Sequence, residues 1–153
     1  MQDLRPLHST PLRIFCVEDN PLIVCHLEMM IEDMGHRFVG STESFADLQN
    51  HVDPSAIDCA LVDIDLCDGA TGPQAVAWLA ANGIPSAFVT GQELTAEQHS
   101  SGVVCTIGKP VTAPSLATSL AALARALDGN RTTSHCRDSI PLVQTSETTP
   151  ALR

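Results

Sequence analysis

The sequence predicts an α/β protein built on a doubly wound parallel sheet. Apolar runs typical of buried strands alternate with amphipathic helical patterns, giving five strand–helix units in succession. The run Cys59–Val62 is unbroken and leads straight into Asp63, which is typical of a strand buried on both faces. Polar or glycine-containing loops follow most of the strands, as expected at the carboxyl edge of such a sheet, and crossovers between its strands are right-handed.

The first unit has clear boundary signals. Residues 12–17 form an apolar run that predicts the first strand. Pro21 then suits the first position of a helix, where its missing N–H costs nothing, and Gly35 suits the left-handed residue that ends it. One face of this helix carries apolar side chains at helical spacing, namely Val24, Leu27, Ile31 and Met34.

The second and third units follow the same plan. We expect a short strand over residues 36–40 and a helix over residues 41–50, followed by a polar turn that contains Pro54. The third strand is the run that ends at Asp63, and its helix covers residues 74–82 after Pro73. The buried stripe of that helix is expected to comprise Val76, Leu79 and Ala80.

The last two units are predicted from shorter signals. Residues 84–89 and 103–107 are expected to be the fourth and fifth strands, with a short helix over residues 95–101 between them. The final helix is expected to start at Pro114 and to bury a stripe of leucines at positions 116, 120, 123 and 127.

The two ends of the chain lack such patterns. Residues 1–10 are expected to form a flexible arm, and the folded domain to cover residues 11–127. Residues 128–153 are rich in Ser and Thr and contain one short apolar patch, so we expect a disordered tail, with a docking peptide as the alternative.

Composition excludes several classes of protein. The net charge is −10, all of it carried by residues 1–127, which disfavours contact with nucleic acid. Apolar runs are too short to span a membrane, and the N-terminus does not resemble a secretory signal, so we expect a cytoplasmic protein. The six cysteines lack the spacing of a zinc site or disulfide framework and are expected to be reduced, with Cys16, Cys59 and Cys105 in the core.

Chemically active side chains gather at the predicted strand ends. The first strand ends in Glu18 and Asp19, the third in Asp63, the fourth in Thr90, and the fifth is followed by Lys109, the only lysine in the chain. If the strands are neighbours, these groups converge at one edge. Carboxylates held together repel one another unless a cation lies between them, and Mg²⁺ is the natural choice because it prefers oxygen ligands. The set therefore predicts a phosphoryl-transfer site with a carboxylate nucleophile.

Residues 11–127 resemble the receiver domain of bacterial two-component response regulators, of the single-domain, CheY-like kind. The resemblance rests on the pair Glu18-Asp19, on Asp63 with Gly69 and Gly72 in the following loop, and on two dipeptides, Thr90-Gly91 and Lys109-Pro110. It implies a flavodoxin-like sheet of strand order 2-1-3-4-5.

The resemblance also implies roles for individual residues. Asp63 would accept a phosphoryl group from a histidine kinase or histidine phosphotransferase in a phosphorelay, and Thr90 and Lys109 would hold its oxygens. Mg²⁺ would be bound by the side chains of Glu18, Asp19 and Asp63 and by the backbone carbonyl of Asp65. Signalling would then run through a downstream protein target or a homodimer, using the face formed by the fourth helix, fifth strand and fifth helix.

Two departures from the family pattern keep an alternative open. Glu18 stands where the acidic pair usually has aspartate, and Thr106 stands where an aromatic switch residue is common. A receiver-fold interaction module that acts without phosphorylation is therefore the second hypothesis. The third, an aspartate-based phosphatase suggested by Asp63-Ile64-Asp65, is disfavoured because the chain has no room for a cap domain, so we do not expect an enzyme.

Overall fold

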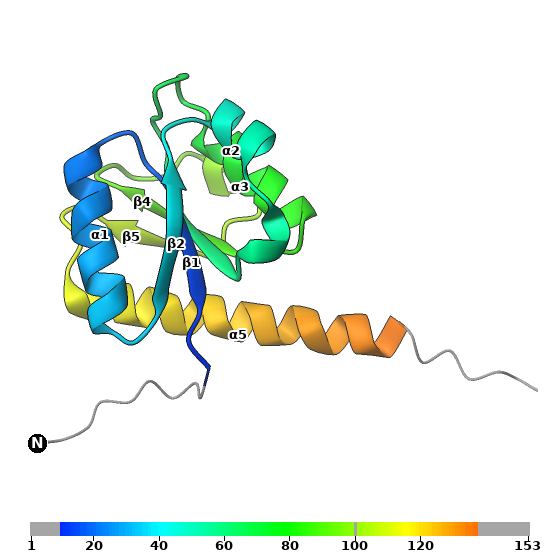
Figure 1. Ribbon diagram of the computed structural model, residues 1–153. Helices are drawn as coiled ribbons and strands as arrows, with labels where there is room; N and C mark the ends of the chain where they lie inside the picture. Colours follow the sequence, from blue (N-terminus) through cyan, green and yellow to red (C-terminus); the bar gives the residue numbers. More distant parts are fainter. Residues whose placement is uncertain (1–9, 100, 138–153) are drawn as a thin grey trace, which may run out of the picture.

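The computed structural model describes residues 10–99 and 101–137, and in it five parallel strands form one sheet of order β2-β1-β3-β4-β5 (Figure 1). This confirms the predicted fold class and strand order. The strands are β1 (Arg13–Val17), β2 (Arg37–Thr42), β3 (Cys59–Asp63), β4 (Ser86–Thr90) and β5 (Cys105–Gly108). The helices are α1 (Pro21–Asp33), α2 (Phe45–His51), the 3-10 turn η1 (Pro54–Ala56), α3 (Gly72–Ala81), α4 (Ala96–His99) and α5 (Ala113–Arg137).

Helices cover both faces of the sheet. Along β1, Ile14 and Cys16 point to the layer formed by α1 and α5, whereas Phe15 and Val17 point to the layer formed by α2 and α3. This alternation is the period of two that a strand imposes. Both faces of β3 and β4 are consequently buried, which explains the unbroken apolar run before Asp63.

The ends of α1 follow from local chemistry. The Asn20 side chain accepts a hydrogen bond from the Leu22 N–H, and Pro21 occupies the first helical position. Gly35 has a φ of 82°, which lets the chain turn away after the last helical residues. Leu27 and Ile31 are fully buried against the sheet, as the helical spacing predicted.

The expected start of the second helix at Ser41 was wrong. Ser41 and Thr42 continue β2 and pair with Cys16 and Val17 of β1. The helix begins instead at Phe45, where the hydroxyl of Ser44 accepts a hydrogen bond from the Asp47 N–H at 3.0 Å. Pairing of Ser41 and Thr42 with β1 therefore outweighed the helical pattern of the local sequence.

The last helix is longer than expected, since α5 continues past Leu127 to Arg137 and extends beyond the sheet (Figure 1). The expectation of disorder from residue 128 therefore does not hold for residues 128–137. Polar residues do not end a helix by themselves, because intrinsic helix propensities differ by less than about 1 kcal/mol for most residue types. Residues 1–9 of the expected arm and 138–153 of the expected tail lie outside the described residues.

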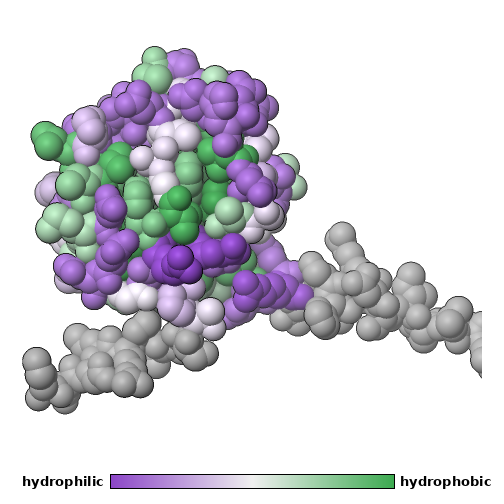
Figure 2. Space-filling model, viewed as in Figure 1, coloured by the Kyte–Doolittle hydropathy of each residue, from purple (hydrophilic) through white to green (hydrophobic). Residues whose placement is uncertain are grey.

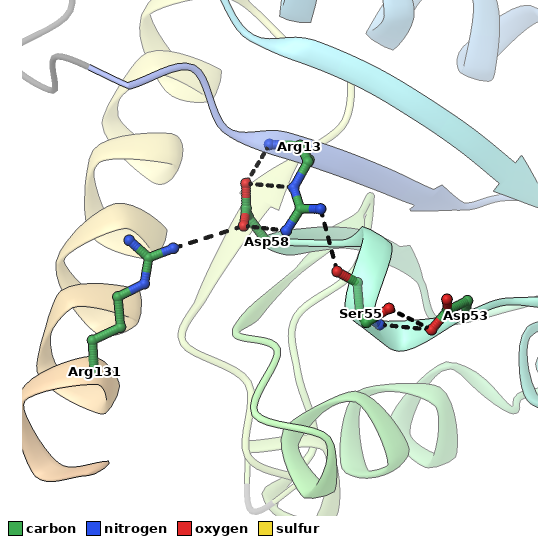
Figure 3. Close-up of polar contacts among 5 residues, drawn as sticks. All are labelled: Arg13, Asp53, Ser55, Asp58 and Arg131. Carbon is green, nitrogen blue, oxygen red and sulfur yellow. Dashed lines mark hydrogen bonds and ion pairs between the residues drawn. The ribbon is translucent and has the colours of Figure 1, made fainter. Parts of the chain in front are cut away.

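A charged cluster holds α5 to the start of β3 (Figure 3). Asp58 accepts hydrogen bonds from the Arg13 backbone N–H at 2.8 Å and from the guanidinium nitrogens Nε and Nη2 at 3.2 and 3.0 Å. Arg13 also donates to the carbonyl of Ser55, and Arg131 of α5 approaches Asp58 at 3.9 Å. Burial disfavours the charged form of Asp58, but these bonds and charges outweigh it and lower its pKa below 3.8.

We expect Asp58→Ala to destabilise the fold by about 2 kcal/mol, because the bonds that Asp58 accepts from the backbone N–H and the guanidinium of Arg13 are lost. The lowered pKa means that this stabilisation is present above pH 3.8 and is lost as the pH falls through the folded-state pKa. Urea unfolding at neutral pH measures the effect. Asp47→Ala, which removes an exposed contact with His51 and a first-turn carboxylate of α2, is the control and should cost less than about 1 kcal/mol. Equal stability of the two variants would contradict this account.

Apolar surface remains exposed over the sheet edge formed by β2, with hydrophilic residues above and below it (Figure 2). Val39 of β2 is one of the exposed large apolar side chains, together with Leu22 and Met29 of α1 and Val104. Among the residues that the structure describes, no helix combines the length and the apolar composition that a bilayer crossing requires.

Candidate functional site

The predicted site residues come together at the carboxyl edge of the sheet. Glu18 follows β1, Asp63 ends β3, Thr90 ends β4 and Lys109 follows β5. Since β1, β3, β4 and β5 are consecutive neighbours, their ends lie side by side. The convergence expected from the sequence is therefore observed.

Lys109 links two of the carboxylates. Its Nζ lies 3.1 Å from Oδ2 of Asp63 and 3.3 Å from Oε2 of Glu18. Glu18, Asp19 and Asp63 each present one carboxylate oxygen to a common region, with these atoms within 4.8 Å of one another. Lys109 thus neutralises part of the charge of a three-carboxylate cluster through direct contacts with Glu18 and Asp63.

Glu18 is held firmly inside this group. Its side chain is 3% exposed, its backbone N–H donates to the Thr42 carbonyl at 2.9 Å, and its carboxylate accepts from the Asn20 N–H at 3.2 Å. Asp19, by contrast, is exposed at the rim. The Glu18 carboxylate contacts Lys109, which the sequence did not predict.

Burial, and then the crowding of negative charge, change the proton affinity of Glu18. Burial, and then the charge of Asp63, raise the pKa of Glu18 to about 7, although the Asn20 N–H and Lys109 act in the opposite direction. Burial disfavours the charged form of Lys109, but its hydrogen bond to Asp63 and the charge of Glu18 outweigh this and raise its pKa above 10.5. The lysine is therefore a permanent cation at neutral pH.

The raised pKa of Glu18 predicts a pH-dependent stability of the metal-free protein. The folded state binds this proton more tightly than the unfolded chain, so the contribution is fully present below pH 4.5 and is lost as the pH rises through about 7. Glu18→Gln should remove this loss. Thermal unfolding in EDTA across that range measures it, and the exposed Glu43→Gln is the control that should retain the wild-type profile. Coinciding profiles for Glu18→Gln and wild type would contradict the prediction.

Thr90 and Asp65 complete the predicted set. Thr90 is 6% exposed, its hydroxyl accepts from the Gln92 N–H at 3.1 Å, and its carbonyl accepts from the Lys109 N–H at 2.9 Å. This last bond joins the ends of β4 and β5 beside the acidic cluster. Asp65 is exposed in the loop after β3, and the predicted metal-binding role of its carbonyl stays a prediction.

Two further residues shape the site in ways that sequence reasoning missed. A side chain at Gly72 would overlap the carbonyl oxygen of Asp63 and the Cα of Ile64, and the Gly72 N–H donates to the Ile64 carbonyl at 3.0 Å. Asp68 binds the start of α2. Gly72 belongs to the loop motif of the sequence, but its close packing depends on how α3 meets β3.

A model of the family described as "response regulator receiver domain" matches residues 14–121. This chain belongs to that family. The receiver is 31% identical over 121 residues to the sensor protein GacS of Pseudomonas syringae pv. syringae, covering 73% of this chain but 13% of that protein. It therefore spans only a small part of this relative.

Solved structures show the same fold. The receiver aligns with the signal receiver domain of a modulated diguanylate cyclase from Desulfovibrio desulfuricans G20 at a TM-score of 0.70 and 24% identity, covering 81% of this chain and 99% of that one. The response regulator PhyR from Brucella abortus aligns at a TM-score of 0.69 and 23% identity, covering 84% and 54% of the two chains. These structures show the fold, and it is the family match that places the chain among receivers of two-component signalling.

The acidic cluster fits a divalent cation. Its carboxylate oxygens are hard ligands already gathered within 4.8 Å. Burial, and then the charge of Asp63, raise the pKa of Glu18, and a bound cation would favour its charged form. Oxygen ligands of this type suit Mg²⁺, which keeps several waters and accepts a phosphate oxygen.

Proposed function

We propose that this receiver accepts a phosphoryl group on Asp63 from a phosphohistidine of a histidine kinase or histidine phosphotransferase. The observation that carries the proposal is the environment of Asp63, a carboxylate at the end of a central strand that contacts Lys109 at 3.1 Å and lies beside Glu18 and Asp19. Such a set combines a nucleophile, a permanent cation and ligands for a metal.

The reaction follows from these groups. An oxygen of ionised Asp63 attacks the phosphorus of the phosphohistidine, the phosphorus–oxygen bond forms, and the phosphorus–nitrogen bond breaks as the imidazole leaves with its electron pair. Lys109 then holds one phosphoryl oxygen, and the Thr90 hydroxyl donates to another. Mg²⁺ bound by Glu18, Asp19, Asp63 and the Asp65 carbonyl would supply positive charge to the transferring group.

Signalling would depend on other proteins. The similarity to part of a sensor protein supports a kinase or phosphotransferase as donor in a cytoplasmic phosphorelay. The receiver would act as an acceptor and switch without being a turnover enzyme, and would contact its target, or a second copy, through α4, β5 and α5.

A second candidate is an interaction module that signals without phosphorylation. It is favoured by Thr106, which is exposed on β5 where receivers commonly carry an aromatic switch residue. Without that aromatic ring, the usual route from Thr90 to the α4 and β5 surface is missing.

Intact-mass measurement after incubation with acetyl phosphate, with and without Mg²⁺, tests the proposal. We expect a single phosphoryl adduct that forms only with Mg²⁺. A chain that takes no phosphoryl group from acetyl phosphate or from a panel of phosphorylated histidine phosphotransferases, yet binds a target protein, would favour the second candidate.

A further inference from the structure

The loop that follows Asp63 is fastened to the first turn of α2 by one side chain. Asp68 accepts hydrogen bonds from the backbone N–H groups of Ala46 at 3.2 Å and Phe45 at 3.4 Å. These groups lack a partner within their own helix because they lie in its first turn. A carboxylate at this position also interacts favourably with the positive end of the helix.

Further bonds close the same loop. The Cys67 N–H donates to the Glu43 carbonyl at 3.1 Å, just before α2, and Leu66 and Gly69 pair across the loop at 2.8 and 3.0 Å. The hydroxyl of Thr71 donates to Asp68 at 2.6 Å. This hydroxyl, chiefly, and then the amides at the start of α2 lower the pKa of Asp68 below 3.8.

Thr71 carries this connection to the phosphoryl acceptor. The next residue, Gly72, begins α3, donates to the Ile64 carbonyl at 3.0 Å and packs directly on the backbone of Asp63. A continuous chain of contacts therefore runs from the start of α2 through Asp68, Thr71 and Gly72 to Asp63.

We propose that Asp68 is a positioning residue for the phosphoryl-acceptor site, an inference that rests on the function proposed above. By holding the loop between β3 and α3 against the start of α2, it fixes the backbone of Asp63 and the carbonyl of Asp65 relative to Glu18 and Asp19. Asp68 does not itself contact the acidic cluster. Its effect passes through the loop backbone.

Asp68→Ala and Asp68→Asn test this role, with Asp53→Ala as a matched control. Asp53 also accepts hydrogen bonds from a backbone N–H and a hydroxyl, both of Ser55, at 3.0 and 2.8 Å. It lies before β3, however, and so outside the loop that follows Asp63. Three quantities are measured: amide hydrogen exchange in metal-free protein, Mg²⁺ affinity from Trp78 fluorescence, and the initial rate of phosphorylation by acetyl phosphate.

Asp68→Ala is expected to speed amide exchange at Phe45, at Ala46 and across the loop. It should also weaken Mg²⁺ affinity and slow phosphorylation by about tenfold each, which is the usual effect of removing a residue that orients metal ligands. Asp68→Asn keeps one acceptor oxygen and should recover part of both losses. Asp53→Ala should match the wild type in all three quantities.

Faster exchange at Phe45 and Ala46 with unchanged Mg²⁺ affinity and phosphorylation rate would overturn the proposal, since Asp68 would then only cap α2. If the wild type itself takes no phosphoryl group, the proposed function fails, but the exchange and Mg²⁺ measurements still decide the positioning role. Wild-type Mg²⁺ affinity in Asp68→Ala would then overturn it.

Discussion

Asp63→Asn is expected to abolish the phosphoryl adduct completely. The amide that replaces the carboxylate has no anionic oxygen to attack phosphorus, and it removes one ligand from the acidic cluster. The variant should still fold, because the Lys109 contact with Glu18 at 3.3 Å is independent of position 63. Intact-mass measurement with acetyl phosphate and Mg²⁺ gives the result directly.

Asp65→Asn is the matched control for this experiment. It makes the same chemical change two residues away, at an exposed side chain, and leaves the backbone carbonyl in place. We expect it to be phosphorylated to an extent close to that of the wild type. An adduct that persists in Asp63→Asn would show that another carboxylate is the acceptor, and peptide mapping would identify it.

Gly72→Ala should produce the largest loss of stability of any single methyl addition to the site. The new Cβ would overlap backbone atoms of Asp63 and Ile64, which cannot move aside as a flexible side chain can. Overpacking of this kind costs about 3 kcal/mol. The shift needed to relieve it would also displace Asp63, the proposed phosphoryl acceptor, so slower phosphorylation is expected alongside a lower urea midpoint.

Gly129→Ala separates this packing effect from the general preference of helices for alanine. Gly129 lies in α5 with open space around it among the described residues, so the substitution should stabilise the protein by about 0.5–1 kcal/mol. If Gly72→Ala were as stable as the wild type, α3 would have to begin differently from the arrangement described above.

Much of the fold was predictable because its signals are local and periodic. The apolar run before Asp63, the helical stripe with Leu27 and Ile31, and the stop at Gly35 each depend on a few neighbouring residues. The element boundaries that were predicted wrongly were those set by contacts with other parts of the fold. Ser41 joined β2 because β1 offered a pairing partner, and α5 continued beyond Leu127 although its composition favoured disorder.

The sequence by itself determined which chemical groups this receiver carries and that they gather at one edge, because parallel strands present their carboxyl ends together. Only the tertiary structure decided how they pair. Lys109 reaches Glu18 as well as Asp63, and Asp68 binds the start of α2. These contacts join residues far apart in the chain, so they depend on loop paths and helix packing, which no local pattern encodes.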